Sequence, residues 1–162
     1  MKRIVLFASG SGSNVENIEQ YFRDNSEVSI SCVLSNKKDA KVFERCNRLN
    51  LNALYFNRHA FYGSDCVLNI LKSLNPDLIV LAGFLWKIPD NLIRSYPNKI
   101  INIHPALLPK YGGKGMYGMH VHEAVKNNNE TETGITIHYV NENYDEGAII
   151  KQAKVALSPN DT

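Results

Sequence analysis

Two polar side chains, Asn102 and His104, stand at the end of a short apolar run, directly before a proline. The run reads K-I-I-N-I-H, and Pro105 follows it. Alternate residues of a strand point to the same side, so Asn102 and His104 share one face while the isoleucines around them, Ile101 and Ile103, face the packed side. Pro105 keeps His104 extended and offers no backbone donor. The pattern predicts a strand that delivers an amide and an imidazole to one place.

An amide beside an imidazole suits reactions at a carbonyl carbon, where an oxygen gains negative charge and a proton has to move. Removing one oxyanion donor typically costs about 2.7–4 kcal/mol of transition-state stabilisation. The same pair also has a purely structural interpretation, in which Asn102 caps a turn and His104 is a half-buried histidine with its hydrogen bonds satisfied. The pair alone leaves both interpretations open.

Length and charge bound the possible functions. The chain has 162 residues, and a chain near this length buries roughly 68–70% of its unfolded surface, enough for one domain with a real core. The net charge is +2, from 18 basic and 16 acidic residues, so we expect small-molecule substrates and neither nucleic acid nor a membrane as partners. No apolar run reaches the ~20 residues of a membrane span, and the first residues lead into a strand, which predicts a cytoplasmic protein. A monomer and a homodimer both remain open.

The three cysteines, Cys32, Cys46 and Cys66, are widely spaced and odd in number. Reduced thiols packed in the structure are the expectation for such a pattern. Metal ligation needs clustered ligands at short spacing, and His120-Val-His122 comes closest. We therefore expect no metal site.

Apolar runs alternate with helical patterns along the chain. Strands are predicted over 3–9, 27–34, 53–56, 77–82, 99–104, 134–140 and 148–156, and helices over 15–22, 39–49, 61–74, 90–96 and from 120. The alternation predicts an α/β fold with an open, mostly parallel, doubly wound (Rossmann-like) sheet in three αβα layers. Ligands of such sheets bind beyond the carboxyl ends of the strands.

A glycine-rich loop, Gly10-Ser-Gly12-Ser13-Asn14, joins the first predicted strand to the first helix. Glycines let the backbone approach a ligand, the helix start favours an anion, and Ser13 and Asn14 add side-chain donors. A G-x-G-x-x-G dinucleotide fingerprint would need a third glycine, where Val15 stands. The loop therefore indicates a phosphate monoester, unless it is a purely structural turn.

Two further segments have open roles. The corner Gly83-Phe84-Leu85-Trp86-Lys87-Ile88-Pro89 either plugs the core or forms a flat wall for a heteroaromatic ligand. The segment from Lys110 to Gly118 holds four glycines and is either a lid or a plain connection.

Three separated segments carry a resemblance to a known family. They are the glycine loop, the run Asn102-Ile-His104-Pro105-Ala-Leu-Leu-Pro109, and the pattern Gly134-x-Thr136-x-x-Tyr-Val-x-Glu-x-x-Asp145-x-Gly147. In these segments, and over essentially its whole length, the chain resembles the phosphoribosylglycinamide formyltransferases, folate-dependent enzymes of purine synthesis. The resemblance implies one formyltransferase domain over 1–162, without the family's C-terminal helix.

The resemblance also implies residue roles. His104 would be the general acid/base, Asn102 would bind the formyl oxygen, and Asp145, otherwise a turn aspartate, would orient His104 and favour its charged form. The phosphate of glycinamide ribonucleotide would lie on Gly12, Ser13 and Asn14. The folate, 10-formyltetrahydrofolate as co-substrate, would contact the backbone of Leu85, Trp86, Lys87 and Ile88, and Asn102.

Besides the absence of the C-terminal helix, the chain departs from the family in two places. Relatives often carry an arginine where this chain has Gly63-Ser64-Asp65, and the insert Gly112–Gly118 is longer than in many of them.

Three rival functions compete with the resemblance. The first rival, a formyltetrahydrofolate hydrolase, shares the Asn, His and Asp but uses water as acceptor. The second is a sugar-nucleotide formyltransferase. The third is a non-catalytic nucleotide-binding module, which gives no role to the three residues together.

Overall fold

The computed structural model describes residues 1–143 and 145–161, and the contacts of the chain group into two compact units. The first unit is Met1–Ile100, and the second begins at Ile101. Tyr144, which falls in the predicted turn 141–147, and Thr162, the end of the expected domain 1–162, lie outside the described residues. Because the contacts divide the chain into two units, the single domain over 1–162 stays a prediction.

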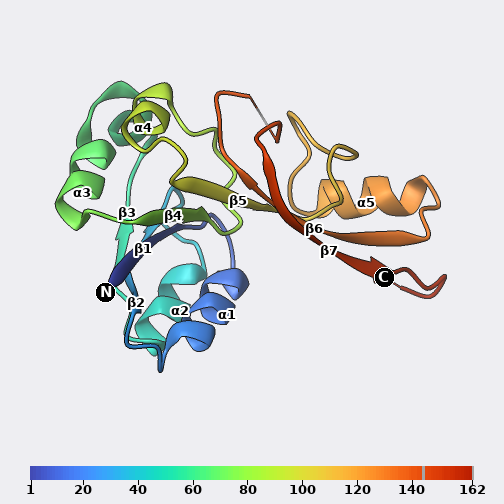
Figure 1. The fold of residues 1–162 in the computed structure, drawn as a ribbon, viewed down its shortest axis with the longest axis horizontal. Coiled ribbons are helices and arrows are strands. Elements are labelled where there is room, and N and C mark those ends of the chain that lie inside the picture. The colour runs from blue at the N-terminus through green and yellow to red at the C-terminus, as the bar shows by residue number, and fades with distance from the viewer. Residues whose placement is uncertain (144, 162) are drawn as a thin grey trace. The chain divides into compact units, whose positions relative to one another are not determined.

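The described residues form seven strands in one open sheet, drawn as arrows in Figure 1. The strands are β1 (Lys2–Phe7), β2 (Val28–Ser35), β3 (Ala53–Tyr55), β4 (Leu78–Leu81), β5 (Ile100–His104), β6 (Glu132–Tyr139) and β7 (Ile149–Ala156). Their order is β3-β2-β1-β4-β5-β6-β7. Pairings β1–β2, β1–β4 and β2–β3 are parallel, whereas β5–β6 and β6–β7 are antiparallel. The predicted open, mostly parallel α/β sheet is confirmed.

Helices cover both faces of the sheet in the first unit. In Figure 1, α1 (Ser13–Phe22) and α2 (Val42–Arg48) lie on one face, and α3 (Cys66–Leu74) and α4 (Asp90–Ser95) lie on the other. Burial on both faces explains why β1 is a continuous apolar run, with Val5, Leu6 and Phe7 fully inaccessible to solvent. This packed strand leads directly into the glycine loop and fixes where that loop begins.

The helix predicted over 61–74 is wrong in its first part. A π-helical turn, η1 (His59–Gly63), comes first, Ser64 is extended, and α3 begins only at Cys66. The Asn57 side chain accepts the backbone N–H of Ala60 at 2.9 Å and starts the turn early. A Cβ at Gly63 would lie 2.6 Å from Nδ1 of His59, so the turn closes tightly there and the helical register is lost.

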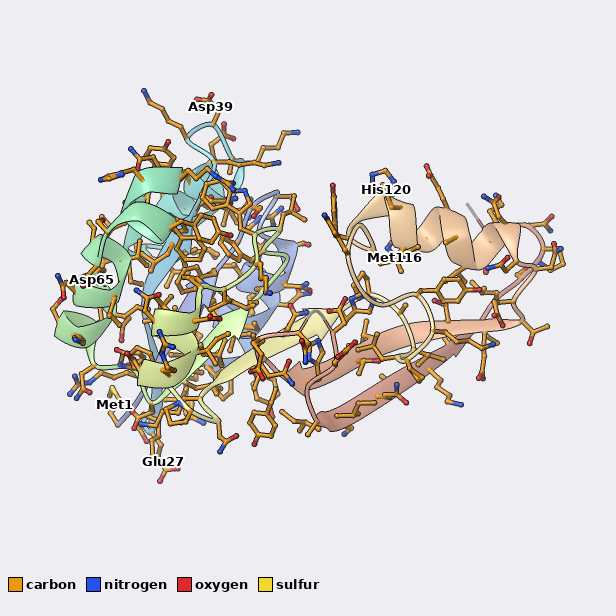
Figure 2. The ribbon with its side chains drawn as sticks, turned by 90° about the horizontal axis from the view of Figure 1, so that it is seen from above. Met1, Glu27, Asp39, Asp65, Met116 and His120 are labelled. Carbon is orange, nitrogen blue, oxygen red and sulfur yellow. The ribbon has the colours of Figure 1, made fainter. Side chains whose placement is uncertain are left out.

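The second unit pairs an antiparallel set of strands with one helix, α5 (Met119–Asn127). Val121 and Val125, one turn apart, are buried with Ala106, and Met116 packs against this cluster. Figure 2 shows Met116 beneath α5 and His120 on the outer side of its first turn. Within the part of the chain that the structure describes, no helix has the length and apolar character to cross a membrane.

Candidate active site

Strand β5 places Asn102 and His104 on one face, as predicted, and β6 completes that face. In the β5–β6 register Asn102 lies opposite His138, and His104 lies opposite Thr136. His104 is 2% exposed, whereas Ile101 and Ile103 are only half-buried. Burial therefore does not distinguish the two faces as expected, because Asn102 is half-buried like the two isoleucines and only His104 is covered, by the backbone at Tyr111.

Both ring nitrogens of His104 have neighbours. Nε2 lies 2.7 Å from the carbonyl oxygen of Tyr111. A carbonyl can only accept, so Nε2 carries a proton and donates it. Nδ1 lies 3.5 Å from Oδ1 of Asp145. The imidazole therefore faces the carboxylate that the resemblance assigns to it.

Asp145 is held by the backbone as well as by its neighbours. Its φ is +54°, a left-handed conformation that Asp tolerates better than most residues. Oδ2 accepts the N–H of Gly113 at 2.9 Å. Burial raises the pKa of this carboxyl, but the neighbouring His138 ring, the hydrogen bond from the Gly113 N–H and the positive charge that the two histidines carry when protonated outweigh it, so the net pKa lies below its usual range. Asp145 is thus a carboxylate at neutral pH.

His138 was missed by sequence reasoning, although it contacts two of the three predicted residues. Its Nδ1 lies 2.9 Å from the Tyr139 carbonyl and therefore donates to it. In the neutral ring Nε2 then accepts from Nδ2 of Asn102, 3.1 Å away. The same nitrogen lies 3.5 Å from Oδ1 of Asp145. This contact turns the amide nitrogen of Asn102 toward His138 and leaves its second N–H for a ligand.

Thr136, part of the family pattern but given no role in it, anchors the chain after His104. Its hydroxyl is fully buried, donates to the Ala106 carbonyl at 2.7 Å and accepts from the Leu108 N–H at 3.0 Å. Gln152 on β7 adds a third bond to the same oxygen at 3.0 Å. These bonds fix the path of the backbone that leaves β5.

The segment from Lys110 to Gly118 is tied down in the structure. The Tyr111 hydroxyl donates to Glu130 at 2.9 Å and accepts from Asn128 at 2.9 Å. Together with the Gly113–Asp145 bond, these contacts hold its backbone against His104. Of the two alternatives, a lid and a plain connection, these contacts favour a lid, because the segment covers the imidazole of His104.

In the first unit, the glycine loop ends at Gly12, which caps α1 with φ +75°. Ser13 is exposed and Asn14 is half-buried. The first N–H groups of a helix have no partner within it, so the α1 start can bind an anion. A cavity of about 540 Å³ borders the loop; it is lined by Ser9, Gly10, Ser11, Lys37, Lys38, Asp39, Ala40 and Lys41.

The corner 83–89, also in the first unit, combines the two alternatives considered for it, a plug of the core and an exposed wall. Ile88 is buried, while Leu85 and Trp86 are half-buried and Lys87 is exposed. Two backbone groups are already engaged, because Ser9 accepts the N–H of Leu85 at 2.9 Å and the Tyr62 hydroxyl donates to the carbonyl of Lys87 at 2.6 Å. The corner therefore plugs the core and still exposes part of an aromatic wall.

Arg58 lies against this wall. Its guanidinium carbon is 4.9 Å from the ring centre of Tyr62 and 5.7 Å from that of Trp86. These are distances at which a cation and an aromatic face attract each other. Arg58 thus places a positive charge next to the corner, although this chain has Gly63-Ser64-Asp65 where relatives often carry an arginine.

The structure brings together Asn102, His104 and Asp145 and adds His138. Among the described residues no group of three or more His, Cys, Asp or Glu side chains could hold a metal ion. Cys32 and Cys46 are buried, as expected, but Cys66 is exposed at the start of α3, where the prediction of a packed thiol is wrong. The assigned catalytic and binding roles stay predictions at this point.

Comparison with known proteins gives a consistent result. The Formyl transferase family matches residues 2–162. The chain is 38% identical to the chloroplastic phosphoribosylglycinamide formyltransferase of Arabidopsis thaliana, covering 99% of this chain and 57% of that protein. It is 36% identical to the phosphoribosylglycinamide formyltransferase of Haemophilus influenzae, covering 100% of this chain and 76% of that protein.

A solved structure agrees with these relatives. The crystal structure of glycinamide ribonucleotide transformylase 1 from Symbiobacterium toebii superposes with a TM-score of 0.89 at 30% identity. The match covers 100% of this chain and 76% of that chain. Fold and sequence similarity therefore extend over all of this chain but only part of each relative.

Proposed function

The chain belongs to the formyl transferase family, and on that premise we propose that it transfers the formyl group of 10-formyltetrahydrofolate to the amine of glycinamide ribonucleotide in purine synthesis. The observation that carries the proposal is the convergence of Asn102, His104 and Asp145. An amide, an imidazole and a carboxylate at one place match acyl transfer to an amine, in which an oxyanion forms and a proton moves.

The reaction begins when the amine attacks the formyl carbon and forms a tetrahedral intermediate. Asn102 donates its second amide N–H to the oxyanion, and protonated His104 stabilises the same charge. A proton then passes from the amine to the departing folate nitrogen through a water held by Asp145. The formyl group moves from one nitrogen to the other, and both the bonds and the protons balance.

His104 has to exchange one contact in order to act. Its Nε2 donates to the Tyr111 carbonyl, so a formyl oxygen can take that proton only if it displaces this carbonyl. In this exchange Nε2 donates to the formyl oxygen in place of the Tyr111 carbonyl oxygen. The Asp145 carboxylate keeps the ring in place from the Nδ1 side. Access to His104 therefore depends on the backbone at Tyr111.

Ligand recognition is assigned to the first unit. The phosphate of the acceptor binds Gly12, Ser13 and Asn14 at the start of α1, because the unpaired N–H groups and the helix dipole favour an anion. The pterin ring lies on the corner Leu85, Trp86, Lys87 and Ile88. Arg58, held over Trp86 and Tyr62, supplies a cation for the glutamate carboxylates of the folate.

The remaining expectations concern the partners of the protein and its location in the cell. We propose that the protein works in the cytoplasm on small molecules, as a monomer or homodimer and without nucleic acid. The net charge of +2 supports this proposal, because nucleic-acid-binding proteins carry basic surfaces. Size-exclusion chromatography with light scattering would decide between one and two copies.

The deciding experiment is a formyl-transfer assay with glycinamide ribonucleotide, run beside a reaction without the acceptor. Formylated acceptor and free tetrahydrofolate should appear in equal amounts, and only when the acceptor is present. Release of formate without the acceptor would instead identify the hydrolase, which shares the three residues. If the formyl group is transferred neither to glycinamide ribonucleotide nor to water, the nucleotide-binding module becomes the better interpretation.

Recognition has its own test. Replacing Ser13 by Ala should raise the KM for the acceptor and leave the KM for the folate unchanged, because only the acceptor carries the phosphate. An equal rise in both values would contradict the assignment of the phosphate to this loop.

A further inference from the structure

Arg45, on α2, reaches across to the glycine loop. Its Nε donates to the carbonyl oxygen of Ser11 at 2.8 Å. Its Nη1 forms an ion pair with Glu16, which lies in the first turn of α1. One side chain therefore joins the loop to the helix that follows it, and it is largely shielded, with 26% of the Arg45 side chain and 19% of the Glu16 side chain exposed.

The first turn of α2 holds the loop at a second point. The N–H of Val42 donates to the carbonyl oxygen of Gly10 at 3.0 Å. A Cβ on Gly12 would lie 2.5 Å from Cγ2 of Val42. The loop is thus pressed onto α2, and two consecutive carbonyls, those of Gly10 and Ser11, are directed toward it.

The direction of a carbonyl fixes the direction of the N–H in the same peptide group. In a planar trans peptide, the C=O and the following N–H point opposite ways. When Arg45 holds the Ser11 carbonyl, the Gly12 N–H must point away from α2. The N–H groups that would bind a phosphate are therefore oriented by a residue that lies behind the loop.

Charge gives Arg45 a second effect on an anion. Glu16 would repel a phosphate bound at the start of the same helix. Two arginines neutralise this carboxylate: Arg45 on one oxygen, and Arg48 on the other at 2.7 Å. Arg48 is 63% exposed and, among the described residues, makes its hydrogen bond to Glu16 and none to the loop, so it serves as a matched control.

We propose that Arg45 is a positioning residue for the phosphate of the acceptor, acting through the Ser11 carbonyl and the Glu16 carboxylate. This inference rests on the proposed function, because it assumes that the glycine loop binds that phosphate. Arg45 itself does not touch the substrate; it sets the orientation of the Gly12 N–H and removes the repulsion from Glu16.

The test compares Arg45→Met with Arg48→Met. We expect Arg45→Met to raise the KM for glycinamide ribonucleotide about tenfold, which corresponds to the loss of one charge-assisted hydrogen bond. The kcat at saturating acceptor and the KM for the folate should stay within twofold of the wild type. Arg48→Met should change the acceptor KM by less than threefold, because it removes one of the two charges on Glu16 but no contact to the loop.

A second acceptor separates positioning from general stability. With glycinamide riboside, which lacks the phosphate, wild type and Arg45→Met should have the same KM. A variant that is only less stable would lose activity toward both acceptors. Equal effects of Arg45→Met on both acceptors, or equal effects of the two arginine variants, would overturn the inference.

Binding of inorganic phosphate, measured by calorimetry, keeps this inference separate from the activity. Wild type should bind phosphate and Arg45→Met should bind it about tenfold more weakly, whether or not formyl transfer is observed. If formyl transfer fails but this difference is found, the proposed function falls and the role of Arg45 at an anion site stands. If transfer occurs and Arg45→Met behaves like wild type, the inference falls and the function stands.

Discussion

A single carboxylate, that of Asp145, serves two imidazoles in the second unit. Its Oδ1 lies 3.5 Å from a ring nitrogen of His104 and 3.5 Å from one of His138, while its Oδ2 accepts a backbone N–H. The pKa of this carboxyl is lowered although burial opposes the shift. At neutral pH the group therefore accepts and does not donate, which suits it to hold a ring nitrogen or a water during proton transfer.

Replacing His104 by Ala or Asp145 by Asn should reduce kcat without preventing acceptor binding. A positioned acid or base contributes about 10²–10⁴-fold to the rate, so we expect losses of that size in kcat and a change of less than threefold in the acceptor KM. Steady-state kinetics with both substrates varied measures the two effects. A large rise in the acceptor KM at unchanged kcat would contradict the assigned roles.

Asp145 should also make stability depend on pH in the acid range. Its folded pKa lies below the ordinary 3.8, so between these two values the unfolded state binds more protons and stability rises with pH. The contribution is complete above pH 3.8 and is lost as the pH falls through the folded pKa. Urea unfolding at several pH values below 5 should show a shallower pH dependence for Asp145→Asn than for wild type.

His138 shows why part of the site was not predictable. Asn102 and His104 follow from strand alternation, and Asp145 from a family pattern, whereas His138 stands in that pattern as an unspecified residue. Its role depends on lying opposite Asn102 in the β5–β6 register. A shift of one residue would turn it to the other face, and the sequence does not fix which residues of two strands are paired.

On the scale of elements, the glycine loop is shaped by the helix behind it as much as by its own residues. Gly12 has φ +75° and no room for a side chain, because a Cβ would meet Val42 at 2.5 Å. Gly10, two residues before it, has nothing within 4 Å of the same position. The two glycines of one loop therefore have different reasons to be glycine.

Gly12→Ala should destabilise the fold and Gly10→Ala should not. A left-handed conformation costs a residue with a Cβ about 1–2 kcal/mol, and overpacking against Val42 adds about 1–3 kcal/mol. We expect Gly12→Ala to lower the free energy of unfolding by about 2–5 kcal/mol, and Gly10→Ala to change it by less than about 0.5 kcal/mol. Chemical denaturation of the two variants beside wild type provides the comparison; equal stabilities would contradict the close packing of the loop on α2.

The predictions from the sequence were least accurate at the ends of helices. Apolar periodicity predicted each helix, but the segment before α3 keeps that periodicity while its backbone forms a π-helical turn and breaks at Ser64. The break depends on Asn57 accepting the Ala60 N–H and on Gly63 packing against His59. Side-chain contacts of this kind do not repeat along the chain, so no periodic pattern indicates them.

For the whole molecule, the alternation of buried strands and helices was sufficient to predict the sheet. Parallel strands covered on both faces read as continuous apolar runs, and β1 and β4 do so. The antiparallel pairing of β6 with β7 was not specified in advance, although a connection of only nine residues, 140–148, is too short for a parallel crossover. Burial predicted from such runs can be tested with the cysteines, which lie in both kinds of environment.

The native protein should expose one reactive thiol, that of Cys66. Cys32 and Cys46 are buried, and burial raises the pKa of both thiols, that of Cys32 to about 11. A thiol reacts as its thiolate, so these two should resist alkylation at pH 8, whereas Cys66 should react. Mass spectrometry after iodoacetamide treatment should show one modification in the native protein, none in Cys66→Ser, and three in the unfolded wild type. Rapid modification of Cys32 in the native protein would contradict the burial of this residue in β2.

The raised pKa of Cys32 should also make stability fall with rising pH in the alkaline range. Between the ordinary pKa of 9.0 and about 11, the unfolded Cys32 loses its proton while the folded one keeps it. The contribution is complete below pH 9 and is lost toward pH 11. Urea unfolding between these pH values should therefore show a weaker pH dependence for Cys32→Ala than for wild type, and identical slopes would mean that the thiol is not protected by burial in the folded sheet.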